Sequence, residues 1–400
     1  MFVYLDNSAT TKPYESVRRA VDEVLSLEFG NPSTLYTLGL SAEKIVKSAR
    51  ENLAKKLGCS VDEVFFTSCG TESDNTAIFG AWKARSKAVL GSGRKPRIIT
   101  SCVEHPAVLR CFEELERLGA DAVYVPVLAD GSLNMEEFKK ALNDDTIFVS
   151  IMHVNNESGA IFPIEEIASL LDKMKTRPIF HTDCVQSFGK LDIDAKKVGV
   201  DMISVSGHKV HGPKGVGALY IRKGLHIPSF VFGGGQEAGF RSGTENMPGI
   251  AGFGAAIEEM NVAKARENMA KVREHLKERL LAEISDVKVN GPVASFGCRE
   301  TSSVYACPSV LNVSFIGCRA EVLLHTLEQD QIFVSTGSAC SSKSKGSHVL
   351  RAMGLKPEEI EGAIRFSFSE DTTIEQIDFA VEKIKAAVES QRALRKAFKK

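Results

Sequence analysis

The chain carries, at Ile203–Tyr220, the stretch ISVSGHKVHGPKGVGALY. An apolar run ends at Val205, and Lys209 follows a Ser-Gly-His turn. The pattern predicts that Lys209 stands at the end of a buried strand, close to the protein interior. An amine in such a place can be kept partly desolvated and can act as a Schiff-base nucleophile. The glycines after it lead into a second predicted strand, Gly217–Ile221.

Outward from this stretch, short apolar runs alternate with amphipathic segments over the first two-thirds of the chain. The predicted strands are Val64–Thr67, Arg97–Ser101, Ala122–Val127, Ile147–Met152, Ile179–Asp183, Met202–Ser206 and Gly217–Ile221. The predicted helices between them include Ala42–Leu57, Thr71–Lys83, Pro106–Leu118, Met135–Leu142 and Ile164–Met174. This alternation predicts an α/β domain with a largely parallel sheet covered by helices on both faces. Its ligands should bind beyond the carboxyl ends of the strands.

The pattern changes near Gly249. One long charged helix is predicted over roughly Ala251–Ile284, followed by further short elements of a smaller α+β domain. These are Val310–Phe315, Ala320–Gln329, Phe333–Ser335, Ala363–Ser369 and a final helix. We therefore predict a large domain over residues 16–250 and a small domain over residues 1–15 and 251–400. The segment Asn290–Pro308, rich in Gly, Ser and Pro, is predicted to be an exposed excursion.

Composition is that of an ordinary globular enzyme, with 400 residues, 43% hydrophobic residues and a formal net charge of -1. We expect neither nucleic-acid nor membrane binding, because there is no strong basic excess and no apolar run of about 18 residues. No secretory signal is visible, and the nine cysteines include no CxxC pair. They predict reduced thiols in the cytoplasm and no metal site. The basic tail RALRKAFKK is interpreted as a solvated helix end, with an acidic docking partner as the alternative.

A loop of small residues, Thr67–Asn75, leads from the first predicted strand into a helix. Such a loop offers free N–H groups and the positive end of the helix dipole to a phosphate. It is not a Walker loop, because the Gly-Lys-Ser/Thr ending is missing. An ordinary helix N-cap at Thr71 is the alternative interpretation.

Polar residues follow the other predicted strands. Asp183 ends one of them, and a buried carboxylate there needs a cationic partner, either a protonated pyridine nitrogen or a structural salt bridge. His105 follows another strand and could stack on a flat ring and move protons. Asn156 adds a neutral polar group, and Arg365, in an apolar run, has the fork geometry that suits a substrate carboxylate.

Cys340 lies in the loop STGSACSSKSKGSH, among small residues and near Lys343 and Lys345. These lysines would favour the thiolate, and an exposed loop would give it reach. The alternative is an incidental surface cysteine.

Together these segments closely resemble the cysteine desulfurases, enzymes of the class V aminotransferase family that use pyridoxal 5'-phosphate (PLP) and have the type I fold. The matching stretches, in family order from Tyr4 to Ser369, are YLDNSATT, FGNPS, FTSCGTESDN, HVNNE, HTDCVQSFGKL, SGHKVHGPKGVGALY, GGGQEAGFRSGTENMPGI, VSTGSAC and IRFSFS.

The resemblance implies a role for each predicted site residue. Lys209 would form the Schiff base with PLP, Asp183 would pair with the pyridine nitrogen, and His105 would stack on the ring and assist proton transfer. The residues implied to hold the phosphate are Gly70, Thr71, Ser206 and His208, with Thr244 reaching it from the other subunit of a homodimer. Gln186 and Asn156 would bond the phenolic oxygen side.

For the substrate, the resemblance implies that Arg365 binds the carboxylate of L-cysteine. Cys340 would take the sulfur as a persulfide and pass it to an acceptor or scaffold protein, for example in iron–sulfur cluster assembly, and the product would be L-alanine. A selenocysteine lyase, another class V PLP enzyme and a non-catalytic scaffold subunit are the alternatives. Tyr36, Cys184 and Ser158 depart from the family pattern, and a sulfur-relay role for Cys298 or Cys307 is a minor possibility.

Overall fold

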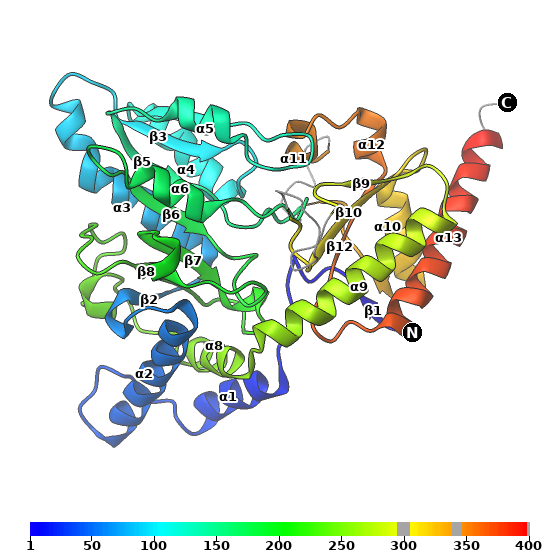
Figure 1. Ribbon diagram of the computed structural model, residues 1–400. Coiled ribbons are helices and arrows are strands. Elements are labelled where there is room, and N and C mark those ends of the chain that lie inside the picture. Colours follow the sequence, from blue (N-terminus) through cyan, green and yellow to red (C-terminus); the bar gives the residue numbers. More distant parts are fainter. Residues whose placement is uncertain (294–304, 338–345, 398–400) are drawn as a thin grey trace.

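The computed structural model describes residues 1–293, 305–337 and 346–397 (Figure 1). The strands are β1 (Val3–Tyr4), β2 (Val64–Thr67), β3 (Arg97–Ser101), β4 (Asp121–Val125), β5 (Thr146–Ser150), β6 (Ile179–Asp183), β7 (Met202–Ser206), β8 (Gly217–Ile221), β9 (Val287–Asn290), β10 (Val310–Phe315), β11 (Ile332–Phe333) and β12 (Ala363–Ser367). The α-helices are α1 (Glu15–Ser26), α2 (Thr37–Leu57), α3 (Gly70–Leu90), α4 (Pro106–Arg117), α5 (Met135–Ala141), α6 (Ile164–Leu171), α7 (Ala195–Val198), α8 (Met247–Glu259), α9 (Val262–Glu283), α10 (Ala320–Gln329), α11 (His348–Ala352), α12 (Pro357–Glu361) and α13 (Ile374–Ala397).

A seven-stranded sheet in the order β2-β8-β7-β6-β5-β3-β4 forms the centre of the larger part of the molecule. Its pairs from β4 through β3, β5 and β6 to β7 are parallel, and β8 is antiparallel to both its neighbours. The predicted, mostly parallel sheet is thus confirmed. β4 ends at Val125, earlier than predicted, since Pro126 has no N–H to continue the ladder.

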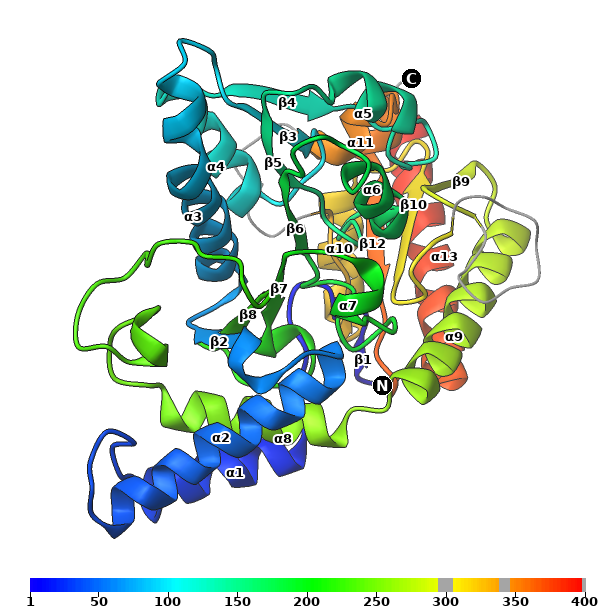
Figure 2. The same cartoon turned by 60° about the vertical axis from the view of Figure 1, so that its left-hand side comes forward.

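Both faces of this sheet are buried. Successive side chains of a strand point to opposite faces, so each strand contributes to the apolar cluster on either side. Ile98 of β3 packs in the apolar cluster formed with α3 and α4, whereas its neighbour Ile99 packs in the cluster that includes α2, α5 and α6. Figure 2 shows α3 and α4 on one side of the strands and α6 and α7 on the other. The sheet therefore presents its strand ends, rather than its faces, to ligands.

A second region contains the antiparallel sheet β12-β10-β9 and the helices α9, α10 and α13. The first residues of the chain join it, since β1 pairs in parallel with β11 and Asp6 bridges to Ser367. Val3 and Leu5 are buried in the same apolar cluster as these helices. The N-terminal segment thereby runs past the edge of the large sheet. The division into domains with the boundaries given above remains a prediction.

The prediction of a single helix over Ala251–Ile284 is wrong. Two helices, α8 and α9, occupy this range, and Met260 between them has the extended angles φ -61° and ψ 119°. The side chain of Asn261 caps α9 by accepting a hydrogen bond from the N–H of Lys264. An asparagine cap competes with helix continuation, because its side chain satisfies the free N–H groups of a new first turn.

Within Asn290–Pro308, the predicted exposure holds for Val293, which is 58% exposed, but is wrong for other described residues at the two ends of the segment. Asn290 is 3% exposed, and Ala306 and Cys307 are fully buried. Ala306 forms a bridge with Ala160, and the N–H of Cys307 donates to the carbonyl of Gly159 at 2.7 Å. Residues 294–304, with Cys298, lie outside the described residues.

Two further observations concern the whole described chain. No helix within residues 1–293, 305–337 and 346–397 is long and apolar enough to cross a membrane. The seven cysteines in these ranges are all free thiols.

Candidate active site

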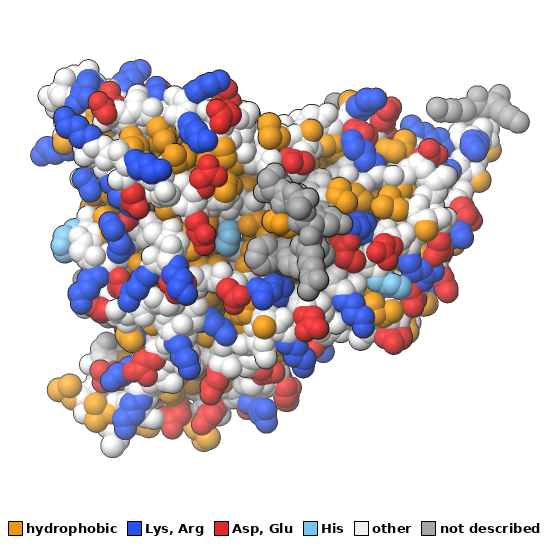
Figure 3. Space-filling view, viewed as in Figure 1, with side chains coloured by type: hydrophobic (Ala, Val, Ile, Leu, Met, Phe, Trp, Pro, Cys, Tyr) orange, Lys and Arg blue, Asp and Glu red, His pale blue; other side chains and the backbone are white. Residues whose placement is uncertain are grey.

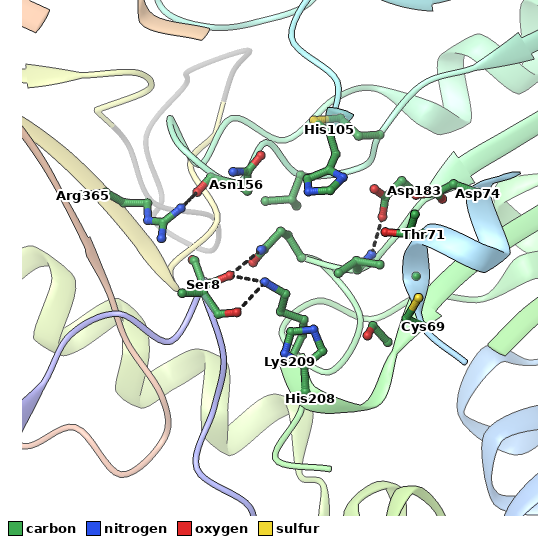
Figure 4. Close-up of a pocket in the computed structure, with 17 residues that line it drawn as sticks. Ser8, Cys69, Thr71, Asp74, His105, Asn156, Asp183, His208, Lys209 and Arg365 are labelled. Carbon is green, nitrogen blue, oxygen red and sulfur yellow. Dashed lines mark hydrogen bonds between the residues drawn. The ribbon is translucent and has the colours of Figure 1, made fainter. Parts of the chain in front are cut away.

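A cavity of about 290 Å³ opens at the carboxyl ends of the parallel strands (Figure 4). Of the predicted site residues that the structure describes, all except Thr244 line it. The predicted residues in its wall are Gly70, Thr71, His105, Asn156, Asp183, Gln186, Ser206, His208, Lys209 and Arg365. Parallel pairing explains the gathering, because the strands β3, β5, β6 and β7 all end at this edge.

Lys209 ends a short 3-10 turn that directly follows β7. Its amine donates hydrogen bonds to the backbone carbonyl oxygens of Ser8 and, at 2.9 Å, of Ala9. Burial, together with the positive charges of Lys190 and Arg365, lowers the pKa of Lys209 to about 7. A substantial fraction of this amine is therefore neutral near pH 7, as a nucleophilic lysine requires.

Two carboxylates, Asp183 and Asp74, lie together on the side of the cavity opposite Arg365 (Figure 4). Burial raises the pKa of both groups, and the charge of Asp183 raises that of Asp74 further. Asp183 Oδ1 accepts a hydrogen bond from the N–H of Val185 at 2.8 Å. Among the described residues no lysine or arginine forms an ion pair with Asp183, so the structure does not support the alternative of a structural salt bridge.

The N-terminus of α3 forms one end of the cavity. The helix begins at Gly70, with Cys69 as its N-cap and no side-chain capping bond. The alternative of an ordinary N-cap at Thr71 is therefore wrong. The buried hydroxyl of Ser206 has no hydrogen-bond partner among the described residues, and both features suit an anionic group.

Glycine is required where β8 passes this loop. A Cβ on Gly217 would lie 2.8 Å from the carbonyl carbon of Cys69 and 2.8 Å from the carbonyl oxygen of Val205. A Cβ on Gly70 would lie 2.8 Å from Val185. The glycines of the sequence thus allow the loop before α3 to lie directly against β8 and the loop after β6.

His105 is the N-cap of α4, and its Nδ1 accepts a hydrogen bond from the N–H of Ala107 at 3.1 Å. Its ring points into the cavity (Figure 4). Burial and the charge of Lys209 lower the pKa of His105 to about 4. The imidazole is therefore neutral near pH 7, and with Nδ1 as acceptor its proton is on Nε2.

Arg365 of β12 reaches the cavity from the second region of the molecule. It is 1% exposed, and its Nη2 is 2.7 Å from Oδ1 of Asp6. Its Nη1 donates to the backbone carbonyl of Asn156 at 3.1 Å, whereas Nε has no partner among the described residues. The guanidinium is thus oriented by two partners and retains donor capacity.

Sequence reasoning missed several groups in this site. It assigned no role to Ser8, whose carbonyl accepts from both Lys209 and Gln186, the latter at 3.0 Å. Asp6, Ala9 and Asp74 were also missed. Asp6, Ser8 and Ala9 belong to the quoted stretch YLDNSATT, and Asp74 to FTSCGTESDN, so the motifs marked their segments without indicating their contacts.

Other predicted positions lie elsewhere. Thr244 is exposed and does not line the cavity, and Tyr36, 60% exposed, is the N-cap of α2. Cys340 lies outside the described residues. After its segment, the hydroxyl of Ser347 donates a hydrogen bond to Glu157. Cys307 is fully buried, which argues against a sulfur relay there.

Comparison with known proteins agrees with this geometry. The Aminotransferase class-V family model matches residues 3–379. The "Cysteine desulfurase" of Nostoc sp. is 42% identical over 98% of this chain and 94% of its own. A solved NifS-like protein is 37% identical with a TM-score of 0.88, covering 97% of this chain and 100% of that one. The structure of SspA in complex with cysteine is 33% identical with a TM-score of 0.79, covering 93% and 100%.

The chain therefore belongs to the class V aminotransferase family, and within it to the cysteine desulfurases. The predicted fold class is confirmed by the same structures.

Proposed function

We propose that this protein is a PLP-dependent cysteine desulfurase that converts L-cysteine to L-alanine and passes the sulfur to an acceptor protein. One observation carries the proposal: the buried, partly neutral amine of Lys209 shares a cavity with the unpaired carboxylate of Asp183. A PLP ring needs both a lysine that can bond to its aldehyde carbon and a carboxylate that can pair with its nitrogen. The names of the relatives support the substrate.

The residues present fit PLP. Asp183 would hold the ring nitrogen, Gln186 and Asn156 the phenolic oxygen, and His105 the ring face. The phosphate would lie at the N-terminus of α3, held by Gly70, Thr71, Ser206 and His208. The hydroxyl of Ser206 has no partner among the described residues and could form a hydrogen bond with it. Bound PLP would supply an electron sink for the substrate carbon atoms.

Arg365 would bind the carboxylate of L-cysteine, since its guanidinium is already oriented by Asp6 and Asn156. Lys209, as a neutral amine, would accept the proton from the substrate carbon. His105, protonated on Nε2, would exchange protons with the substrate side of the ring. These assignments rest on the positions of the three side chains around one cavity.

The sulfur step would use Cys340 as nucleophile. Its thiolate would form an S–S bond with the substrate sulfur, the C–S bond would break, and carbon would keep the electron pair and take up protons to give L-alanine. Cys340 would then carry a persulfide, from which an acceptor or an added thiol takes the sulfur.

A homodimer would complete the site, with Thr244 reaching the phosphate of the other subunit. The exposure of Thr244 supports this, as do large exposed hydrophobic residues around the α1–α2 connection (Figure 3, lower left). They include Leu25, Leu27, Phe29, Leu35 and Tyr36. An exposed apolar patch of this kind is typical of an interface. The free cysteines suit a cytoplasmic protein.

The test measures L-alanine and sulfide from L-cysteine with a thiol reductant, after recording the visible spectrum. We expect equal amounts of both products from the PLP-coloured wild type. A Cys340→Ser variant should keep the colour and lose both products, whereas Cys59→Ser, at a position away from the cavity, should keep both. Products from selenocysteine alone would indicate a selenocysteine lyase, and an absence of colour after addition of PLP would overturn the proposal.

A further inference from the structure

Lys190, in the loop after β6, is a buried lysine that no part of the proposed mechanism uses. It is 6% exposed, and no carboxylate forms an ion pair with it among the described residues. Its Nζ donates a hydrogen bond to Oε1 of Gln186 at 3.2 Å. An ammonium group buried without a direct counter-ion costs stability. The fold itself therefore gives no reason for a lysine at this position.

Lys190 is connected to Lys209 by a short chain of hydrogen bonds. Gln186, which accepts from Lys190, donates through Nε2 to the carbonyl of Ser8, and Lys209 donates to that same carbonyl. The two lysines also line one small cavity of about 20 Å³ behind the active site. The two amines are thus both buried beside one small cavity, and charges in a protein interior interact more strongly than in water.

We propose that Lys190 is a positioning residue of the active site, whose positive charge keeps the nitrogen of Lys209 neutral and whose hydrogen bond orients the amide of Gln186. The inference rests on the proposed function, because it gives Lys209 and Gln186 their roles toward PLP. Lys190 itself contacts neither substrate nor PLP in this scheme.

The pKa values of the two amines agree with an influence of Lys190 on Lys209. Burial lowers the pKa of Lys190 to about 8 and that of Lys209 to about 7. Both amines are thus more easily deprotonated than an exposed lysine. After burial, the charge of Lys190 is the largest influence that lowers the pKa of Lys209, ahead of Arg365.

Other titratable groups act on the pair in known directions. Asp6 and Asp183 raise the pKa of Lys209. Cys307 and Glu370 raise the pKa of Lys190, whereas Arg365 lowers it. Glu370 is itself engaged, because Tyr14 donates to it and His211 lies 3.4 Å away. Burial lowers the pKa of His208 to about 4, so this neighbour adds no charge near pH 7.

The test is a pH titration of the visible absorption of the PLP-loaded, full-length protein. Its midpoint reports protonation of the nitrogen that joins Lys209 to PLP, and it does not depend on turnover. We expect Lys190→Met and Lys190→Gln to raise this midpoint by roughly one pH unit, because each removes a nearby positive charge. Lys196→Met, at an exposed position on α7, should keep the wild-type midpoint.

The two variants separate the effect of charge from that of hydrogen bonding, because glutamine at position 190 can still donate to Gln186 whereas methionine cannot. Lys190→Gln also serves as the test if Lys190→Met does not fold. Unchanged midpoints in both variants, or a shift in Lys190→Met alone, would overturn the charge effect. A wild type that shows no PLP band, or a band that survives in Lys209→Ala, would instead contradict the proposed function. The two failures are therefore distinguishable.

Discussion

Arg365 and Asp6 form an ion pair in the wall of the cavity, with 2.7 Å between Nη2 and Oδ1. They are 359 residues apart in the chain, and the pair joins β12 to the segment after β1. The arginine is almost fully buried, whereas the carboxylate is about one-fifth exposed. Asp6 thus orients the guanidinium, and its Nε remains without a partner among the described residues.

The first prediction concerns this pair. Charge-assisted hydrogen bonds are worth about 1.5–3 kcal/mol, so Arg365→Gln should raise the KM for L-cysteine roughly 10- to 100-fold. Asp6→Asn should raise it less, because the guanidinium remains but is less well oriented. Steady-state alanine formation measures both, with the exposed Arg19→Gln as control. An unchanged KM in Arg365→Gln would remove Arg365 from substrate binding.

The second prediction concerns stability without cofactor. Lys209 has a pKa of about 7 in the folded protein against 10.5 when unfolded, so between these values the unfolded chain binds more protons. The free energy of unfolding of the wild type therefore gains a contribution from Lys209 that rises with pH across this window. Lys209→Met removes the cost of burying a charged amine but also loses the hydrogen bonds to Ser8 and Ala9. The net effect should be a free energy of unfolding at pH 7 that is higher by roughly 2 kcal/mol than in the wild type.

Urea denaturation of the PLP-free proteins at pH 7 and near pH 10 checks this prediction. The advantage of Lys209→Met should shrink at the higher pH, because near pH 10 the unfolded wild-type lysine has begun to lose its proton and the difference in protonation between the two states is smaller. Lys196→Met, at an exposed site, should show no such difference. An advantage that grows with pH would contradict the sign of the pKa shift.

The third prediction concerns the contact between β8 and the loop before α3. Gly217→Ala should destabilise the protein by about 1–3 kcal/mol, because the added methyl group has no space beside Cys69 and Val205. It should also weaken PLP binding, since any relief moves the loop that precedes Gly70. Thermal denaturation and PLP titration measure the two effects. Gly91→Ala, at the C-cap of α3 with φ -63°, is the control: its Cβ would lie 3.1 Å from the carbonyl oxygen of Lys87, so it should destabilise the protein less than Gly217→Ala and leave PLP binding unchanged.

The fourth prediction concerns assembly. Light scattering should give about twice the chain mass of 43.5 kDa for the wild type. Leu35 is 93% exposed in the single chain, so Leu35→Asp should shift the protein toward the monomer and weaken PLP binding through loss of Thr244 from the partner subunit. Leu118→Asp, at an exposed position after α4, should leave the mass unchanged. A monomeric wild type that binds PLP would contradict the dimer.

Much of the fold followed from local patterns. Five strands of the large sheet have the predicted bounds, because apolar runs of four or five residues bounded by turn residues leave little choice of register. The prediction of one long helix over Ala251–Ile284 was wrong, because its charged and apolar residues continue helical periodicity across Met260 and Asn261. Only the packed structure shows that Asn261 begins a new helix there.

The sequence by itself determined the residue types of the site, their order and their places at strand ends, because these follow from strand periodicity and local motifs. Tertiary structure alone decided which groups meet: Ser8 and Lys209 are 201 residues apart, and Asp6 and Arg365 are still further apart. It also decided the lowered pKa of Lys209, because only folding buries this amine and brings the charge of Lys190 close to it. A pattern along the chain specifies neither burial nor distance, and these two quantities control the chemistry of a lysine.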